Sequence, residues 1–143
     1  MKKILLCAFL LPCAAMHTGP HNGLPSSSNL VEVRSGTWPI NMERDIEYRD
    51  TSYSLIFRNQ EVLTDVVLDT LEFGNITQLR YFEKALTALK SGGNGDIAKF
   101  KDYSIKRTDS KLQPTSYLLR LKWSSTQFQQ PEADLMRKTI EGL

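Results

Sequence analysis

Cysteine and histidine are scarce in this 143-residue sequence, and both are confined to its first 21 residues. The histidines are His17 and His21, in a coil rich in Gly and Pro. A Ser-His-Asp triad needs a histidine held beside its nucleophile, and a metal clip needs ligands at fixed spacing. Two histidines in a coil meet neither requirement. The sequence therefore predicts no nucleophilic triad and no metal site.

Glycine-rich phosphate loops and long hydrophobic runs are also missing. The cluster Gly92-Gly93-Asn94-Gly95 follows a predicted helix, so it offers no helix N-terminal amides to a phosphate. The longest apolar run, Ile4–Leu11, is far shorter than the roughly 20 residues that cross a bilayer. We therefore expect no nucleotide cofactor, no other cofactor and no transmembrane helix.

The first fifteen residues have the pattern of a secretory signal. Two lysines precede the apolar run, Pro12 breaks it, and Cys13-Ala14-Ala15 places small residues for cleavage after Ala15. The alternative is a buried N-terminal helix or strand. Cleavage would remove Cys7 and Cys13, the only cysteines, and leave a protein without thiols or disulfides. The pattern predicts an exported protein, periplasmic or extracellular.

Lipidation at Cys13 is a second possibility for this segment. The sequence Leu10-Leu11-Pro12-Cys13 places a cysteine just after the apolar run. A lipidation site normally has a small residue directly before its cysteine, and here that residue is proline. Membrane attachment is expected only if Cys13 is lipidated.

The charges balance overall but are unevenly placed. Without residues 1–15 the chain has sixteen basic and sixteen acidic residues, which gives no bulk attraction to nucleic acid. Residues 16–75 hold nine acidic and four basic side chains, whereas residues 76–143 hold seven acidic and twelve basic ones. Either the two parts neutralise each other in the fold, or the surface is dipolar and docks a partner.

Residues 16–49 have the composition of an extended tether. Turn-forming residues dominate up to Asn29, although Val31 and Val33 could form a short edge strand. The sequence Trp38-Pro39-Ile40 is expected to pin the tether to the domain, and the alternative is that Trp38 is an exposed binding anchor.

Residues 50–143 have the pattern of one α+β domain. Alternating apolar residues predict strands at 53–58, 62–73, 100–107 and 117–123. The second is bent near Asp65, and the last has Trp123 on the same face as Tyr117 and Leu119. Helical spacing predicts helices over 75–91 and from Pro131 to the end. The predicted fold is a two-layer sandwich in the order β-β-α-β-β-α, with a mainly antiparallel sheet of about four strands and its helices on one face.

Chemistry-bearing side chains in this domain are few. Asp65, Asp69 and Glu72 follow one predicted strand, where a carboxylate pair could act as acid and base in a hydrolase. Basic residues alternate with aromatics on the last strand, which places them on opposite faces, whereas a nucleic-acid platform needs both on one face. We expect no catalytic residue, and we name as partner-binding candidates Trp38, Lys106, Arg120 and Lys122.

Three functions remain open at this point. The first is a small exported, non-enzymatic protein that binds a macromolecule or ligand, with a protein as the expected partner and nucleic acid not expected. The second is a structural subunit of a larger assembly, such as a virion, that keeps its N-terminal segment. The third is a small hydrolase. Neither the ligand nor the oligomeric state can be derived from the sequence.

Overall fold

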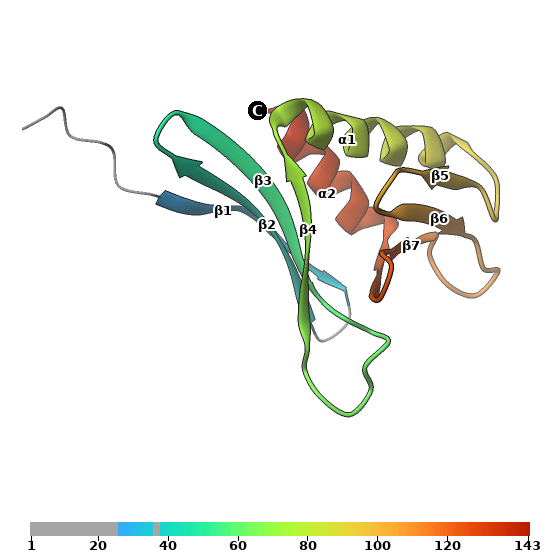
Figure 1. Cartoon of the computed structure of the whole chain (residues 1–143). Helices are drawn as coiled ribbons and strands as arrows, with labels where there is room; N and C mark the ends of the chain where they lie inside the picture. The colour runs from blue at the N-terminus through green and yellow to red at the C-terminus, as the bar shows by residue number, and fades with distance from the viewer. Residues whose placement is uncertain (1–25, 36–37) are drawn as a thin grey trace, which may run out of the picture.

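The computed structural model describes residues 26–35 and 38–143, and in them ten elements follow one another along the chain (Figure 1). Four strands precede the first helix, and four more precede the second. The strands and helices are β1 (Ser26–Ser35), β2 (Trp38–Glu47), β3 (Asp50–Arg58), β4 (Leu68–Gly74), α1 (Ile76–Ser91), β5 (Ile97–Lys99), β6 (Ser104–Thr108), β7 (Ser116–Arg120), β8 (Ser125–Gln129) and α2 (Gln130–Glu141).

The strands form two antiparallel four-stranded sheets, which we call sheet A (β1-β2-β3-β4) and sheet B (β5-β6-β7-β8). The α+β class is confirmed. The prediction of one sheet of about four strands is wrong, because the residue pattern does not reveal β2, β5 and β8 as separate strands. The short edge strand expected at Val31 and Val33 is β1, which is longer and begins at Ser26. Each sheet joins its strands in chain order, so strands that follow one another in the sequence pair as antiparallel neighbours.

Strands β1 and β2 lie in the stretch that composition assigns to a tether. Val33, Ile40 and Met42 are buried and alternate with polar residues that face away from the core. Composition does not indicate these strands, because half of their residues lie on the solvent-exposed face of the sheet and are mostly polar. The folded unit therefore includes residues from Ser26 onward, and Ile40 anchors its segment as expected.

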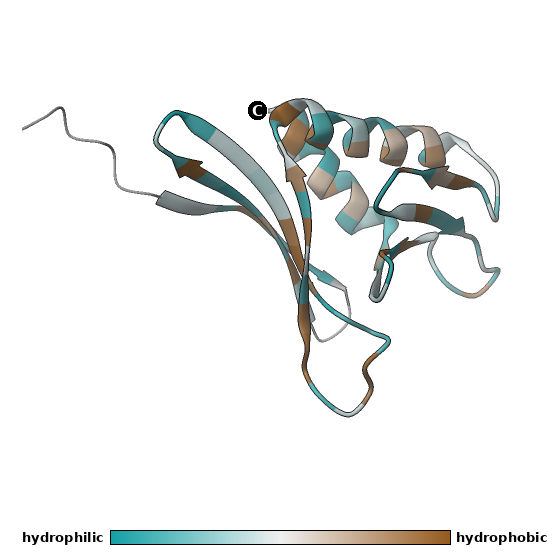
Figure 2. Ribbon diagram, viewed as in Figure 1, coloured by the Kyte–Doolittle hydropathy of each residue, from teal (hydrophilic) through white to brown (hydrophobic). Residues whose placement is uncertain are grey.

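The chain between β3 and β4 projects as a long loop (Figure 1). Its base is closed by a 2.8 Å bond from the Asn59 N–H to the Val67 carbonyl. Leu63 and Val66 are exposed on this loop, and Figure 2 shows hydrophobic stretches of the loop between hydrophilic ones. The predicted strand over 62–73 is therefore shorter than expected, beginning at Leu68, and the predicted bend at Asp65 is part of the loop.

Strand β7 ends at Arg120, three residues before the predicted end. The Leu121 N–H donates to the Ser124 carbonyl at 2.8 Å, which closes a tight turn into β8. Trp123 lies in that turn and is 79% exposed, so the prediction that it continues the face of Tyr117 and Leu119, which are buried, is wrong. Strand β8 was missed because Phe128 is its only large apolar residue.

Both helices begin with the predicted signals. The Asn75 side chain accepts a bond from the Gln78 N–H at 3.1 Å, and Pro131 stands in the first turn of α2. Gly92 ends α1 in an extended conformation, with φ −82°, and not in the left-handed one that glycine commonly supplies at a helix end. A Cβ there would lie 2.4 Å from the Asp96 Oδ2, which instead accepts from the Gly93 N–H at 2.7 Å.

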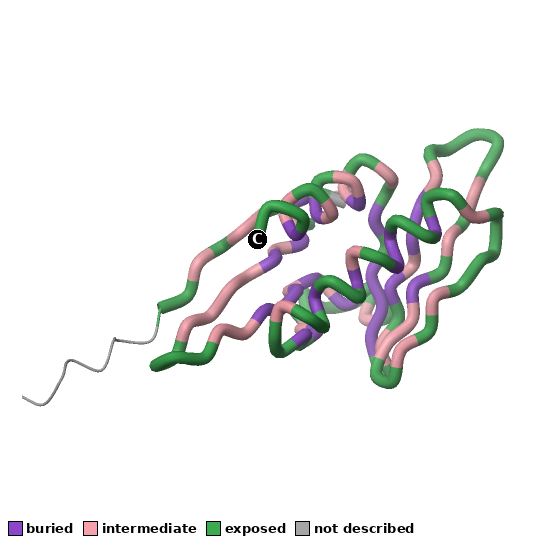
Figure 3. Tube along the Cα trace, turned by 90° about the horizontal axis from the view of Figure 1, so that it is seen from above, coloured by how far each residue is buried: buried purple, intermediate pink, exposed green. Residues whose placement is uncertain are grey.

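The two helices hold the sheets together. Helix α1 contacts α2, β3, β4, β5 and β6, whereas α2 contacts β1, β7 and β8. Buried residues of both sheets and both helices form one core, seen as the purple segments in Figure 3. The outer face of each sheet, on the side away from the helices, is therefore left to solvent. No helix in the described part of the chain combines the length and apolar character needed to cross a bilayer.

Candidate functional site

The outer face of sheet B is basic. Lys99 pairs with Ser104, which pairs with Arg120, and Lys106 pairs with Leu118 in the next row. These side chains lie opposite the buried Ile105 and Leu119, so they share the solvent face. Strands β5 to β8 contain no acidic residue. We call Lys99, Lys106 and Arg120 the basic face; it contains two of the predicted partner-binding residues.

Arg107 belongs to the same strands but is held in the structure. Its Nη1 donates to the Leu89 and Lys90 carbonyls at 2.8 and 2.6 Å, and its Nε donates to Asp109 at 2.9 Å. The hydrogen bond with Arg107 lowers the pKa of the Asp109 carboxyl below its ordinary value. Arg107 therefore caps the C-terminus of α1 and is not available to a partner.

The turn between β7 and β8 extends the basic face at one end. The Lys122 ammonium lies 5.0 Å from the centre of the Trp123 ring, within the range of a cation–π contact. Lys122, Trp123 and Arg120 line one pocket of about 420 Å³ together with Glu61. Lys122 is one of the predicted partner-binding residues. Trp123 was expected on the same strand face as Leu119, but β7 ends at Arg120 and Trp123 lies in the turn.

Asn59 fixes this turn against sheet A. Its Nδ2 donates to the Trp123 carbonyl at 3.2 Å, and its Oδ1 accepts from the Ser125 N–H at 3.3 Å and from the Glu61 N–H at 3.0 Å. Asn59 is buried, so these bonds satisfy a polar group that would otherwise be costly to bury. The exposed tip that carries Lys122 and Trp123 is therefore rigidly placed.

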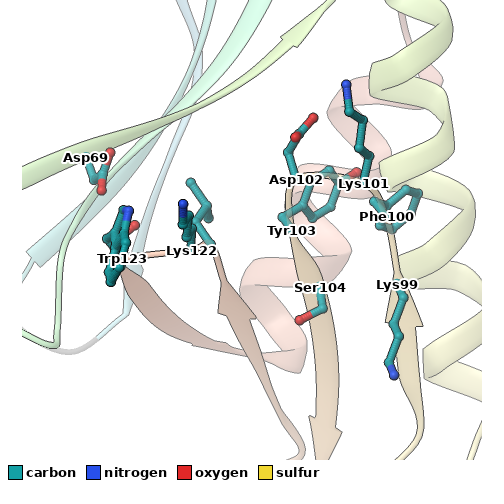
Figure 4. Close-up of a pocket in the computed structure, with 11 residues that line it drawn as sticks. Asp69, Lys99, Phe100, Lys101, Asp102, Tyr103, Ser104, Lys122 and Trp123 are labelled. Carbon is teal, nitrogen blue, oxygen red and sulfur yellow. The ribbon is translucent and has the colours of Figure 1, made fainter.

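A groove runs between β4 and sheet B, and Figure 4 shows part of it. Its first part, about 620 Å³, lies between Asp69 on β4, the turn with Lys122 and Trp123, and the β5–β6 turn from Lys99 to Ser104. Its second part, about 420 Å³, continues along Leu71, Glu72 and Phe73. The two parts share Phe100, Lys101, Asp102 and Tyr103. We call this the edge groove.

Stacked aromatic rings form one wall of the edge groove. The rings of Phe100 and Tyr103 are 4.3 Å apart and nearly parallel, and Tyr103 also contacts Phe73 and Phe82. Burial raises the pKa of the Tyr103 phenol, so this hydroxyl stays protonated at neutral pH. The two rings give this wall an apolar surface with one hydroxyl, and the charged Lys101 and Asp102 lie between them in the sequence.

The three candidate carboxylates do not gather into one site. Asp65 is exposed on the β3–β4 loop, whereas Asp69 and Glu72 lie on opposite faces of β4, three residues apart. Asp69 lines the first part of the edge groove and Glu72 the second. Glycoside hydrolysis needs two carboxyl groups facing one bond, and this placement does not supply such a pair.

Trp38 lies apart from the other partner-binding candidates. It begins β2 and is 37% exposed, with the Arg58 guanidinium 4.8 Å from its ring centre. It lines a pocket of about 240 Å³ with Ile40, Val62 and Leu63. The structure therefore places Lys106 and Arg120 on one face of sheet B and Lys122 in the turn at the end of that face. Trp38 lies on sheet A.

Comparisons with protein-family models, with curated proteins and with solved structures found no match to this chain. Within the described residues, no three His, Cys, Asp or Glu side chains are placed to hold a metal ion. The predicted cleavage site at Ala15, the lipidation alternative at Cys13 and the two histidines lie outside the described residues.

Proposed function

We propose that this protein is a small exported, non-enzymatic binding protein whose basic face docks an acidic protein partner. The observation that supports this most is the charge pattern of sheet B, where every charged strand residue is basic. Lys99, Lys106 and Arg120 are exposed on one face, and Lys122 and Trp123 extend it. Such a face attracts acidic surfaces and speeds their docking.

A protein partner fits this face better than a nucleic acid does. In the described strands of sheet B, the aromatic residues Tyr117 and Phe128 are buried on the inner face. Bases therefore find no aromatic platform between the cations, and only Trp123 stands at one end. Exposed Trp and Arg are the residue types that dominate protein–protein binding energies.

The test uses a fluorescent poly-glutamate chain as probe and a charge-reversed variant. We expect Lys106→Glu with Arg120→Glu to weaken binding at least tenfold, because two attractive charges become repulsive. Lys84→Glu with Lys138→Glu on the helices changes net charge equally and is the control. Equal loss in both variants, or no binding by the parent protein, would refute the basic face as the site.

A structural subunit of an assembly is the second candidate, favoured by the exposed apolar side chains of the β3–β4 loop, where Leu63 is 86% exposed. The intact mass of protein purified from its native source distinguishes the exported binding protein from the assembly subunit. A start at residue 16 supports export, whereas an uncleaved chain beginning at Met1 supports the assembly.

A further inference from the structure

Strand β4 is an edge strand of sheet A, and the edge groove lies beside it. Asn59 and Val67 form a hydrogen-bonded pair, and such pairs alternate along antiparallel strands. The register therefore places the pairs Phe57–Asp69 and Leu55–Leu71 in the β3–β4 ladder. The N–H and C=O groups of Leu68, Thr70 and Glu72 point the other way, where no described strand pairs with them.

One of these outward groups is capped by a neighbouring side chain. The Thr70 N–H donates to the Asp69 Oδ1 at 2.8 Å. A free N–H at a sheet edge invites another strand, and proteins commonly blunt such edges with charged side chains. Here the cap is a single carboxylate that an incoming carbonyl can replace without breaking the β3–β4 ladder.

The edge groove has room for a strand beside β4. Its two parts lie along Asp69 and along Leu71 to Phe73, two to four residues apart on the same strand. In an added strand, every second side chain lies on the same face. Successive side chains of that face would contact first one part of the groove and then the other. The opposite wall, with Tyr103 and Phe100, is aromatic, so the groove-facing side chains should be apolar.

The groove leads onto the basic face at its Leu68 end. Lys99 and Lys122 line the first part of the groove, and Lys122 lies beside Trp123 in Figure 4. A segment leaving the groove at this end meets lysines, so its next residues should be acidic. Antiparallel pairs are the commoner kind, and in an antiparallel strand this end is the C-terminal one.

We propose that the partner inserts an extended segment into the edge groove, as a fifth strand of sheet A antiparallel to β4. The segment carries apolar residues at alternate positions and acidic residues at its C-terminal end. This inference rests on the proposed function, since it assigns the acidic partner a mode of docking. Main-chain hydrogen bonds supply affinity, and the groove and lysines supply specificity.

The probe is a fluorescein-labelled peptide, Thr-Val-Thr-Val-Thr-Glu-Glu-Glu, titrated by fluorescence anisotropy. With the valines facing the groove, the threonine N–H groups face β4 and the valine N–H groups face solvent. We expect N-methylation of the third and fifth residues to weaken binding at least tenfold. N-methylation of the second and fourth residues is the matched control, expected to change it less than threefold.

Two protein variants test the edge and its cap. Asp69→Ala removes the competing acceptor, so we expect about fivefold tighter peptide binding. Glu72→Gln removes the same charge from β4 without freeing the Thr70 N–H, and we expect less than a twofold change. Binding should also slow hydrogen exchange at the Thr70 and Glu72 amides, measured by NMR.

Other outcomes overturn the inference and leave the proposed function open to its own test. Equal binding of both N-methylated peptides, with unchanged exchange at Thr70, means that the peptide binds by charge alone. If the peptide fails to bind while poly-glutamate still binds the basic face, the added strand is refuted and the basic face remains the proposed binding site. Dimers that Thr70→Pro dissociates would make a second copy of this chain the occupant of the edge instead.

Discussion

Asn59 is the residue on which the geometry of the candidate site most depends. Its amide bonds to backbone groups of Glu61, Trp123 and Ser125, and its own N–H closes the β3–β4 loop. It therefore couples the end of β3 in sheet A to the turn before β8 in sheet B. An asparagine suits this position because one side chain supplies both a donor and an acceptor.

Replacing Asn59 by alanine should destabilise the fold by about 2–3 kcal/mol, because the buried Ser125 N–H and the Trp123 carbonyl lose a partner. Urea unfolding followed by circular dichroism measures this. Gln60→Ala at the exposed neighbouring position is the control, expected to change stability by less than about 0.5 kcal/mol. Equal effects at the two positions would mean that Asn59 does not couple the sheets.

Single residues also show what the sequence can and cannot predict about a site. Lys106 and Arg120 lie on a solvated face, as predicted, because they alternate with the buried Ile105 and Leu119 along β6 and β7. Trp123 was misplaced because the same alternation gives no sign of where a strand stops. The backbone bond between Leu121 and Ser124 ends β7, and residue types alone do not reveal that bond.

At the scale of elements, an ion pair joins the two helices near the end of α1. The Lys90 Nζ donates to both oxygens of Asp134 at 2.8 and 3.1 Å. The hydrogen bond from Lys90 lowers the pKa of Asp134 below its ordinary value of 3.8. A lowered pKa means that the pair stabilises the fold above pH 3.8 and that this contribution is lost as the pH falls through the folded-state pKa.

Asp134→Asn should therefore reduce stability at pH 7, by no more than about 1 kcal/mol for a partly exposed pair. The difference from the parent protein should vanish in acid, below the folded-state pKa. Urea midpoints from pH 7 down to pH 2 measure it. In a Lys90→Met background the same substitution should lose most of its effect at pH 7; an undiminished effect would show that Asp134 acts through another partner.

Elements differ in how well the sequence reveals them. Helices α1 and α2 were found because caps and apolar periodicity coincide at Asn75 and Pro131. The two sheets were not separated, since pairing between distant strands has no local signal. The edge groove depends on that separation: Asp69 and Trp123 are far apart in sequence and meet only because sheet B lies beside β4.

At the scale of the whole molecule, the uneven distribution of charge along the sequence places acidic side chains mainly on sheet A and basic side chains on sheet B. We call this difference the charge division. On the outer face of sheet A the register gathers six acidic side chains, of Glu32, Glu43, Asp45, Glu47, Asp50 and Glu72, against the basic Arg34 and Arg58. The outer face of sheet B is basic throughout its described strands. Since both helices lie against inner faces, these charges do not neutralise each other across the core.

A protein beginning at residue 16, with sixteen basic and sixteen acidic residues, should bind both cation and anion exchangers at pH 7 and low ionic strength, each through a different face. Exchanging Lys106→Glu with Glu47→Lys keeps the net charge unchanged but weakens the charge division. We expect elution from both resins at lower salt. Exchanging Glu47→Arg at the end of β2 with Arg49→Glu in the β2–β3 turn preserves the charge division and should leave elution unchanged. If both exchanges elute alike, retention depends on local clusters, and the dipolar surface has no role in bringing an acidic partner to sheet B.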